Sequence, residues 1–255
     1  MKKTIAIVTG ATGGIGKEFT RSLLDDPELD EIWAVARNEA KLNMLKAEFG
    51  KRIRIVKADI GSKSGLATLE ELLQNNPVII EYLINNAGMA KMGRSDAFSA
   101  EEISATIDVN CKAAVIISNM CIPYMKAGSH ILNVSSASSF QPTPYINLYG
   151  ATKVFLRHYS RALGMELDGT GIKVTAVCPG WVDTDMLPKE KNGKKIYYPG
   201  ITTAEKVVAK ALKDSRKGRA LSICTAYAKF LHVYGKLMPQ KVVMKQWLMG
   251  IKDLI

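Results

Sequence analysis

Short apolar runs alternate with longer segments of helical periodicity along most of the chain. The short runs are apolar on both faces, which is typical of strands buried in a parallel sheet. They predict strands over residues 4–8, 31–36, 53–57, 82–85, 130–134, 173–178 and 220–224. Apolar residues at helical spacing predict helices over residues 16–24, 39–49, 62–73, 102–125, 148–167 and 203–214. The alternation predicts an α/β fold of right-handed βαβ units, with about seven strands in a doubly wound parallel sheet and helices on both faces.

Two segments do not follow this rhythm. Residues 182–200 are rich in Lys, Gly and Pro and have weak periodicity, so we expect a mobile loop over residues 182–203 that borders the substrate. Residues 225–255 read as two amphipathic helices broken near Met238-Pro239, because proline ends helices. No internal repeat or linker is visible, so we expect a single domain over residues 1–255 that ends in a helical extension.

The composition is that of one globular unit. Hydrophobic residues make up 47% of the 255 residues and charged residues 23%, which is ample for one sizeable core. The formal net charge of +11 fits solubility together with an anionic cofactor, and it also fits an acidic partner protein or an anionic membrane surface. The basic residues are scattered without a recognition motif, which disfavours nucleic acid as a partner.

Cysteine spacing and the N-terminal residues indicate a cytoplasmic protein. The four cysteines, at positions 111, 121, 178 and 224, have no metal-ligand or CxxC spacing, and the three histidines are isolated, so no metal site is expected. The N-terminal apolar run stops at Thr9-Gly10, too early for a signal peptide. No uncharged apolar stretch reaches 18 residues, so no transmembrane helix is predicted.

A glycine-rich turn directly follows the first predicted strand and opens the first helix. In Thr9-Gly10-Ala11-Thr12-Gly13-Gly14-Ile15-Gly16, Gly10 permits a tight turn, Gly14 lets the backbone approach a pyrophosphate and Gly16 allows close packing of helix on strand. The helix N-terminus would present free N–H groups and a positive dipole end to phosphates. A plain strand-to-helix turn remains the alternative, since glycine-rich turns are common.

The end of the second strand indicates which dinucleotide would bind. In dinucleotide folds an acidic residue at this point hydrogen-bonds the ribose 2′-hydroxyl, whereas an arginine accommodates a 2′-phosphate. Here Ala36 is neutral and Arg37 is basic. A guanidinium can hold a phosphate through paired hydrogen bonds, so we expect NADP(H) as the cofactor. The alternative is a solvated surface arginine.

Acid–base chemistry is suggested by Tyr149 and Lys153, which lie four residues apart in the first turn of a predicted helix and so share a face. A nearby ammonium group and a positive nicotinamide should lower the pKa of the phenol. Ser136 closes the fifth strand, at the sheet edge where α/β folds bind ligands. Asn110 lies mid-helix, where asparagine is unfavourable, so a specific role is expected.

In these residues the chain resembles the short-chain dehydrogenase/reductase family, and the match covers nearly the whole chain. The motifs stand in the family's order: Thr9-Gly10 with Gly14-Ile15-Gly16, Asp59, Asn85-Asn86-Ala87-Gly88, Asn110, Ser136, Tyr149 with Lys153, and Pro179-Gly180 with Thr184. The resemblance implies a Rossmann-type domain. Within the family, the sequence most resembles the hydroxysteroid dehydrogenase and 3-ketoacyl reductase branch.

The resemblance also implies roles for individual residues. Tyr149 would be the general acid/base, Ser136 would orient the substrate oxygen, Lys153 would bind the nicotinamide ribose and Asn110 would hold a water of the proton relay. The remaining cofactor-binding residues would be Gly10, Thr12, Gly14, Ile15, Gly16, Arg37, Asp59, Ile60, Asn86, Ala87, Gly88, Pro179, Gly180, Val182 and Thr184. One departure is that many NADP-using relatives carry a second basic residue where this chain has Gly13. Arg37 should therefore discriminate largely alone, and the preference for NADP(H) should be less than absolute.

The substrate is less sharply defined. We expect contacts from Ser136, Ser138, Tyr145, Tyr149 and Met186. The segment 138–148 is apolar and aromatic and holds no basic residue to bind a carboxylate, which favours a hydrophobic ketone or alcohol. The alternatives are a 3-oxoacyl-thioester reductase, which the positive charge would suit, and a non-catalytic NADP(H)-binding protein.

Assembly and the C-terminal extension complete the expectations. By analogy with the family, the helices over residues 102–125 and 148–167 predict a homodimer or homotetramer. The extension 225–255 carries five lysines against one aspartate. We expect its two helices to close over the substrate pocket or to pack on a second subunit. The alternative is that they contact an anionic membrane surface peripherally.

Overall fold

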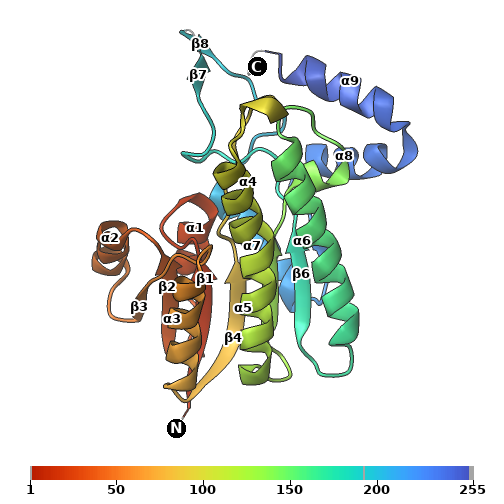
Figure 1. The fold of residues 1–255 in the computed structure, drawn as a ribbon. Coiled ribbons are helices and arrows are strands. Elements are labelled where there is room, and N and C mark those ends of the chain that lie inside the picture. The colour runs from red at the N-terminus through yellow and green to blue at the C-terminus, as the bar shows by residue number, and fades with distance from the viewer. Residues whose placement is uncertain (1, 192, 253–255) are drawn as a thin grey trace.

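The computed structural model describes residues 2–191 and 193–252 and contains one seven-stranded parallel sheet (Figure 1). The strand order is β3-β2-β1-β4-β5-β6-β9. This is the doubly wound order predicted from the alternation of strands and helices. The strands are β1 (Lys3–Thr9), β2 (Glu31–Ala36), β3 (Ile53–Lys57), β4 (Val78–Asn85), β5 (His130–Val134), β6 (Lys173–Val177) and β9 (Leu221–Ser222).

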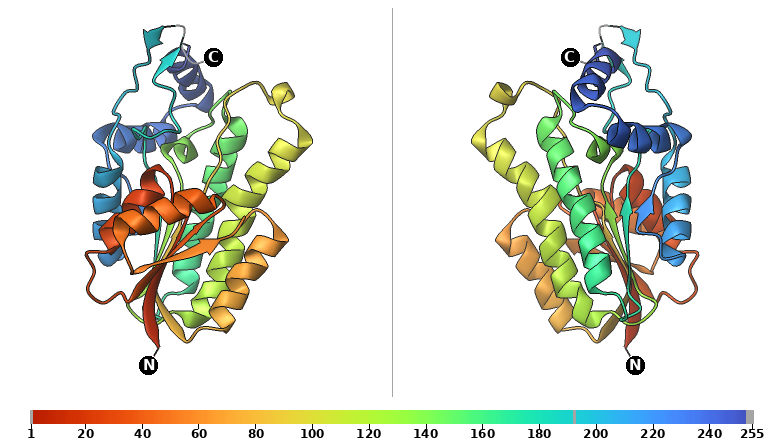
Figure 2. Two further views of the ribbon diagram at one scale, coloured as in Figure 1. Left: turned by 90° about the vertical axis from the view of Figure 1, so that its left-hand side faces the viewer. Right: turned by 90° about the vertical axis from the view of Figure 1, so that its right-hand side faces the viewer.

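Helices cover both faces of this sheet, as the side views in Figure 2 show. The apolar side chains of α1, α2 and α7 pack with one face of the central strands, and those of α3, α5 and α6 pack with the other. The helices are α1 (Gly14–Leu23), α2 (Glu39–Phe49), α3 (Lys63–Gln74), α4 (Ala100–Ile107), α5 (Ala113–Cys121), α6 (Asn147–Glu166), α7 (Ala204–Arg216), α8 (Ala226–Leu237) and α9 (Gln240–Gly250).

Strand β4 starts four residues before its predicted beginning. It begins at Val78 and pairs with β1 through Ile80 opposite Ile5 and Tyr82 opposite Ala6, so Glu81 is the extra residue of a bulge. Glu81 interrupts the apolar run, which hid the first half of the strand from the sequence pattern. Burial raises the pKa of its carboxyl group.

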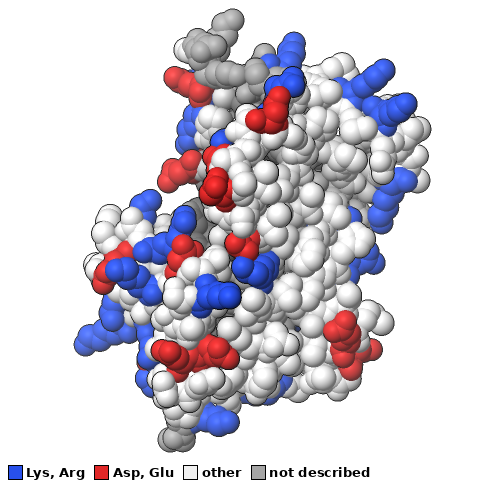
Figure 3. All heavy atoms as spheres, viewed as in Figure 1, with Lys and Arg blue, Asp and Glu red and all other residues white. Residues whose placement is uncertain are grey.

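The single helix predicted over residues 102–125 is interrupted. Between α4 and α5 a π-helical turn spans Asp108–Lys112, and a short 3₁₀ turn, Ile122–Tyr124, follows α5. By length and composition this 25-residue run, Ala100–Tyr124, could cross a membrane. Its residues Ala113, Ile117 and Cys121 are however fully buried against the sheet, so it is a core helix of the α/β fold. In Figure 3 the surface over α5 and α6 shows few charged side chains.

The segments after β6 gather at the carboxyl end of the sheet (Figures 1 and 2). The loop that begins at Val182 is tied at its ends by a bridge between Val182 and Thr202, and it carries a small hairpin of β7 (Glu190–Lys191) and β8 (Lys194–Lys195). Helices α8 and α9 are separated at Met238-Pro239, as the proline predicted. Both helices lie above the strand ends in Figure 1.

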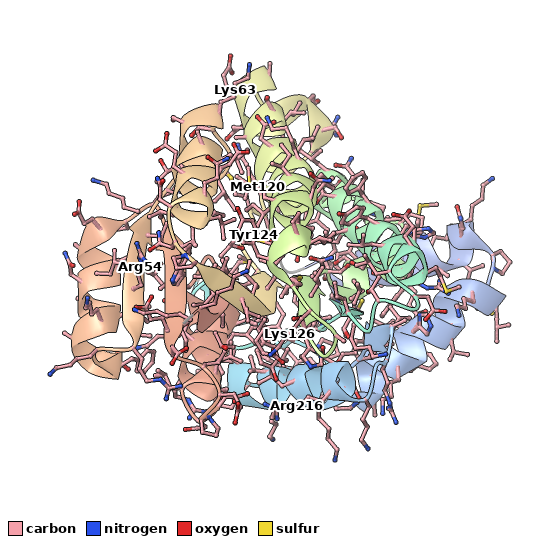
Figure 4. The ribbon with its side chains drawn as sticks, turned by 90° about the horizontal axis from the view of Figure 1, so that it is seen from below. Arg54, Lys63, Met120, Tyr124, Lys126 and Arg216 are labelled. Atoms are coloured by element: carbon pink, nitrogen blue, oxygen red, sulfur yellow. The ribbon has the colours of Figure 1, made fainter. Side chains whose placement is uncertain are left out.

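At the opposite end of the sheet, His130 is held in its neutral form. Its ring stacks on Tyr82 at 4.9 Å between centroids, and Nδ1 shares a 3.0 Å hydrogen bond with the Ser215 hydroxyl. Arg216, labelled in the view from below (Figure 4), donates to the Tyr82 hydroxyl at 3.2 Å. Burial, assisted by the nearby Arg216 and Lys173, lowers the pKa of His130 to about 4.

This buried histidine predicts an acid-sensitive fold. The pKa of His130 lies near 6.5 in the unfolded chain, so its contribution is fully present above pH 6.5 and is lost as pH falls toward 4. That contribution is about 3 kcal/mol, since one pKa unit corresponds to about 1.4 kcal/mol. Urea titrations between pH 7 and 4 should show a flatter pH dependence for His130→Phe than for the wild type. The exposed His158→Gln serves as control, and equal slopes in all three proteins would contradict the assignment.

Candidate active site

The turns after β1 and β4 are joined by a network of buried polar groups. The Thr9 hydroxyl accepts hydrogen bonds from the backbone N–H groups of Asn86 and Ala87 at 3.0 and 3.1 Å. The Asn86 side-chain amide donates to the carbonyl oxygens of Thr9 and Gly10 at 3.0 and 3.2 Å. Asn86 was predicted to line the cofactor, but here its side chain holds the glycine-rich turn in place.

Two glycines of this turn are required by geometry. Gly10 has a φ of +64°, a conformation that side chains rarely adopt. At Gly16 an added Cβ would lie 2.2 Å from the Gly10 carbonyl oxygen and 2.4 Å from Nδ2 of Asn86. Since backbone cannot yield at such distances, only glycine lets α1 approach β1 this closely. Gly14 packs against Thr184, which brings the loop after β6 to the same turn.

A cavity of about 370 Å³ opens beside the glycine-rich turn, within the size range of small-molecule sites. Seven of the predicted cofactor residues line it, namely Gly10, Thr12, Arg37, Asp59, Ile60, Ala87 and Gly88. Two polar residues that the sequence analysis missed, Asn38 and Lys41, line it as well. Lys41 is thus a second cation in the lining, in addition to Arg37, which was predicted to discriminate largely alone. The one available signal was that Lys41 follows Arg37 by one helical turn.

The π-helical turn Asp108–Lys112 carries Asn110, which bonds to Met89 of the cavity lining. Its Oδ1 accepts from the backbone N–H of Met89 at 2.8 Å, and its Nδ2 donates to the Met89 carbonyl at 2.9 Å and to the Thr152 hydroxyl at 3.0 Å. Asn110 thereby links the turn after β4 to α6. Wide turns of this kind inside helices occur often at functional sites.

Lys153 is a buried cation whose ammonium group has more N–H donors than the described residues use. Only 3% of the residue is exposed, and its ammonium group donates to the Val134 carbonyl at 2.8 Å. Burial lowers its pKa to about 8. Within the part of the chain that the structure describes, no second acceptor meets this ammonium group. A side chain at Gly88 would approach the ammonium at 3.2 Å and Oδ1 of Asn110 at 3.4 Å, so Gly88 keeps the space in front of both open.

Tyr149 and Ser136 meet next to Lys153. The Lys153 ammonium lies 5.5 Å from the centre of the Tyr149 ring. Burial raises the pKa of the Tyr149 phenol, and the Ser136 hydroxyl, within hydrogen-bonding reach, opposes that rise. The expectation that Lys153 lowers this pKa is not met in the protein alone. Removal of the phenol from water is the largest cause of the rise, and it outweighs the hydrogen bond with Ser136.

The predicted substrate residues differ in position and exposure. Ser136 caps the short 3₁₀ turn Ala137–Phe140, which contains Ser138. Tyr145 has a φ of +67°, an unusual conformation for a bulky residue, and its carbonyl accepts from Gly93 at 2.8 Å. Met186 is 59% exposed on the loop after β6.

Pro179, Gly180, Val182 and Thr184 stand on the loop after β6, and of these Thr184 lies against Gly14 of the glycine-rich turn. The Pro179 carbonyl accepts from the N–H of Ala137 at 2.7 Å, which ties this loop to the end of β5. Gly180 faces the start of α8. Ile15 packs in the core beneath the glycine-rich turn.

Three aromatic residues beside the site come from segments far apart in the sequence. Trp181 lies against Tyr198 at 4.9 Å and stacks on Trp247 of α9 at 6.0 Å between ring centres. The Trp247 indole donates to the Pro144 carbonyl at 2.9 Å. Helix α9 is thus attached to the segment that precedes Tyr149. Apolar surroundings were predicted here from the sequence, but no local pattern pairs these three rings.

The residues present suit a phosphorylated dinucleotide. The cavity is lined by Gly10 and Thr12 of the glycine-rich turn, by the cations Arg37 and Lys41, and by the Asp59 carboxylate. Backbone N–H groups at a helix N-terminus bind phosphate, and arginine binds a terminal phosphate. The unused donors of buried Lys153 would suit sugar hydroxyls.

Comparison with known proteins agrees with this geometry. The family model described as short chain dehydrogenase matches residues 4–195. An uncharacterized oxidoreductase of Staphylococcus epidermidis is 31% identical over 210 residues, 82% of this chain and 90% of that protein. The NADP-dependent 3-hydroxy acid dehydrogenase YdfG of Escherichia coli is 35% identical over 185 residues, 70% of this chain and 72% of that protein.

A solved structure extends the similarity to the whole chain. A short-chain dehydrogenase from Sphingobium yanoikuyae, in complex with NADPH, superposes with a TM-score of 0.76 at 26% identity. The match covers 99% of this chain and 96% of that one. It therefore includes the loop after β6 and both C-terminal helices.

The close contact at Gly16 gives a stability prediction with an internal control. Gly16→Ala should lower the free energy of unfolding by about 1–3 kcal/mol or more, because its Cβ would overlap the Gly10 carbonyl. Gly13→Ala has open space around its Cβ and an extended backbone, and should change stability by less than about 1 kcal/mol. Chemical denaturation of both variants measures the difference. Equal destabilisation would show that the close approach of α1 is not limiting.

Proposed function

This chain belongs to the short-chain dehydrogenase family, and on that premise we propose that it interconverts an apolar ketone and its secondary alcohol with NADP(H). The observation that carries the proposal is the meeting of Tyr149, Ser136 and Lys153 on and beside α6, to which Asn110 is bonded through Thr152. A protein that only binds the nucleotide has no need of a proton donor beside a buried ammonium group, so the non-catalytic alternative is disfavoured.

NADP(H) is supported by both relatives and residues. The E. coli relative is named as NADP-dependent, and the Sphingobium structure contains NADPH. In this chain Arg37 and Lys41 line one end of the cavity. We propose that this pair binds the 2′-phosphate, and that the helix N-terminus at Gly14 to Gly16 faces the pyrophosphate.

Each residue of the site then has a task in the reaction. When bound, the nicotinamide supplies or accepts the hydride. During reduction the Tyr149 phenol donates its proton to the carbonyl oxygen, while the Ser136 hydroxyl donates a hydrogen bond to the same oxygen. Lys153 holds the ribose with its unused donors and keeps a positive charge near the phenol. We place a relay water in the space that Gly88 leaves open, between the Lys153 ammonium and Oδ1 of Asn110.

The substrate class follows from the surroundings of Tyr149. Trp181, Tyr198 and Trp247 form an aromatic wall, and Phe140 and Tyr145 flank the proton donor in the sequence. Such surroundings favour a bulky apolar group next to the carbonyl. A second candidate is a 3-oxo or 3-hydroxy acid or its thioester, which the name of the E. coli relative favours.

We further propose a cytoplasmic homodimer or homotetramer that forms through α4, α5 and α6. Several large apolar side chains are exposed on this face, namely Ile103, Ile107, Phe155 and Met165. The same face shows few charged side chains in Figure 3. A subunit interface would remove this apolar surface from water. The loop over residues 182–203 and the helices over 225–255 are parts of the same domain in this proposal.

Catalysis by Tyr149 is tested by removing one oxygen atom. Tyr149→Phe should lower kcat/KM for ketone reduction about 10²–10⁴-fold, the usual contribution of a positioned acid, while NADPH binding followed by fluorescence is retained. Tyr124→Phe is the control, since Tyr124 lies at the opposite end of the molecule (Figure 4). A panel of apolar ketones, 3-oxoacyl thioesters and 3-hydroxy acids identifies the class by its kcat/KM. Turnover that is low in wild type and unchanged in Tyr149→Phe across the panel would contradict an enzymatic role.

Cofactor choice is tested at the cation pair. Arg37→Ala should weaken NADPH binding by about 1.5–3 kcal/mol, the range for hydrogen bonds to charged groups, and leave NADH binding nearly unchanged. Lys41→Ala should show a smaller loss of the same kind. Lys46→Ala, an exposed lysine on the same helix outside the cavity, should have no effect. Calorimetric titration with both nucleotides measures all three variants, and equal wild-type affinities for NADPH and NADH would exclude this recognition.

A further inference from the structure

Helix α8 has two faces of different character. Its inner face packs on the 3₁₀ turn that follows Ser136: Ala228 is fully buried there, and a Cβ at Gly235 would lie 2.5 Å from the Phe140 carbonyl. Its outer face exposes Phe230, Val233 and Leu237, which are 51%, 53% and 77% accessible. The spacing of three and four residues puts these three on one side of the helix. The outer face is therefore apolar, although none of the described residues 2–191 and 193–252 covers it.

Helix α9 repeats the pattern. Val243 and Ile251 are buried against the rest of the chain, while Val242 and Met249, seven residues apart, are 42% and 66% exposed. Met238, at the corner between the two helices, is exposed as well. Both helices thus turn apolar side chains outward in addition to the apolar face that anchors each of them to the core.

Lysines accompany these outward apolar side chains on both helices. Lys229 and Lys236 lie beside the exposed stripe of α8, and Lys241, Lys245 and Lys252 lie beside that of α9, all of them exposed. Residues 215–252 contain no Asp or Glu at all. In Figure 3 the upper right-hand surface, over α9, shows basic and uncharged side chains only. We call the outer faces of α8 and α9, with these five lysines, the tail surface.

We propose that the tail surface docks peripherally on an anionic lipid membrane. A helix with exposed apolar residues and flanking lysines lies in the plane of a bilayer, with its apolar side chains below the headgroups and its ammonium groups at the phosphates. Each lysine near such a surface strengthens binding about fivefold. The tail surface supplies five lysines and at least five exposed apolar side chains, so both contributions act together.

A second copy of the chain is a poorer occupant. A two-fold interface pairs the same patch on both subunits, which would place ten lysines close together without a carboxylate to neutralise them. Like charges facing one another across an interface disfavour association. An acidic protein would neutralise the lysines but would not by its charge alone bury the apolar side chains of Phe230, Leu237 and Met249. An anionic bilayer offers phosphates to the lysines and an apolar interior to these side chains.

Docking would also bring the aromatic wall of Trp181, Tyr198 and Trp247 close to the lipid. Trp247 of α9 stacks on Trp181 and is bonded to Pro144, so the inner side of the tail is part of the aromatic wall. An apolar ketone dissolved in the bilayer would then reach the site without crossing water. This consequence rests on the proposed function, whereas the docking itself does not depend on any reaction.

Vesicle co-sedimentation with the full-length chain tests the docking. Wild type should pellet with phosphatidylcholine vesicles that contain 30% phosphatidylserine at low salt, and should be released at 0.5 M salt because screening weakens exposed charge interactions. Pure phosphatidylcholine vesicles should retain little protein. Lys241→Glu with Lys245→Glu should weaken binding more than tenfold.

The controls separate docking from general charge and from folding. Lys51→Glu with Lys126→Glu makes the same change of net charge at two exposed lysines that precede β3 and β5, at the amino ends of the strands, and should bind like wild type. Leu237→Ser with Met249→Ser should lose binding while all lysines remain. Circular dichroism and NADPH binding, unchanged in every variant, show that the chain is folded.

Two results would overturn the proposal. One is a wild-type chain that ignores phosphatidylserine vesicles at low salt. The other is a lower oligomer mass by light scattering for the Lys241/Lys245 or Leu237/Met249 variants, which would make the tail surface a subunit interface. Failure of ketone turnover with intact vesicle binding would reject the proposed reaction and leave the docking in place.

Discussion

The structure depends on one polar tie between two neighbouring strands. Where β1 ends, the chain crosses to one face of the sheet, and where β4 ends it crosses to the other, so a crevice opens between them. The Thr9 hydroxyl and the Asn86 amide close the floor of that crevice through four hydrogen bonds. Because those bonds fix the Gly10 carbonyl, they also fix how closely α1 can approach, and with it the direction of the helix N-terminus. The nucleotide cavity is the space left above this tie.

From this floor a buried polar chain leads to the proton donor. The turn after β4 carries Met89, whose backbone is held on both sides by Asn110, and Asn110 in turn bonds to Thr152 of α6. Tyr149 and Lys153 stand on the same helix, three residues before Thr152 and one residue after it. A regular α-helix over residues 100–124 would leave no wide turn at Asn110, so the π-helical turn is the local irregularity that makes the connection. Lys153 is the residue of this polar network that most needs a further hydrogen-bond acceptor. Its ammonium group is buried, and among the described residues it donates only to the Val134 carbonyl.

The sheet and the motif residues could be predicted well because both depend on patterns within short stretches of sequence. Strands apolar on both faces and glycines at fixed offsets are visible in a few consecutive residues, and β2, β3 and β5 were predicted with the bounds that the structure has. The errors lie where distant segments decide. Glu81 reads as a break but occupies a bulge opposite β1. Lys41 reads as an ordinary helix lysine until the fold brings it beside Arg37, and no local pattern announces that Trp247 bonds to Pro144.

The junction between the tail and the core is built differently from the rest of the interior. The sheet faces are packed with apolar side chains that are almost all fully buried. At the junction, by contrast, the side chains of Gln141, Thr143, Arg157 and His232 place buried polar atoms among the rings of Phe140 and its neighbours. Burial lowers the pKa values of Arg157 and His232, which lie among further basic groups. The contact of α8 with the core therefore differs from the contacts of the other helices with the sheet: buried polar atoms lie beside aromatic rings there, in place of a purely apolar layer.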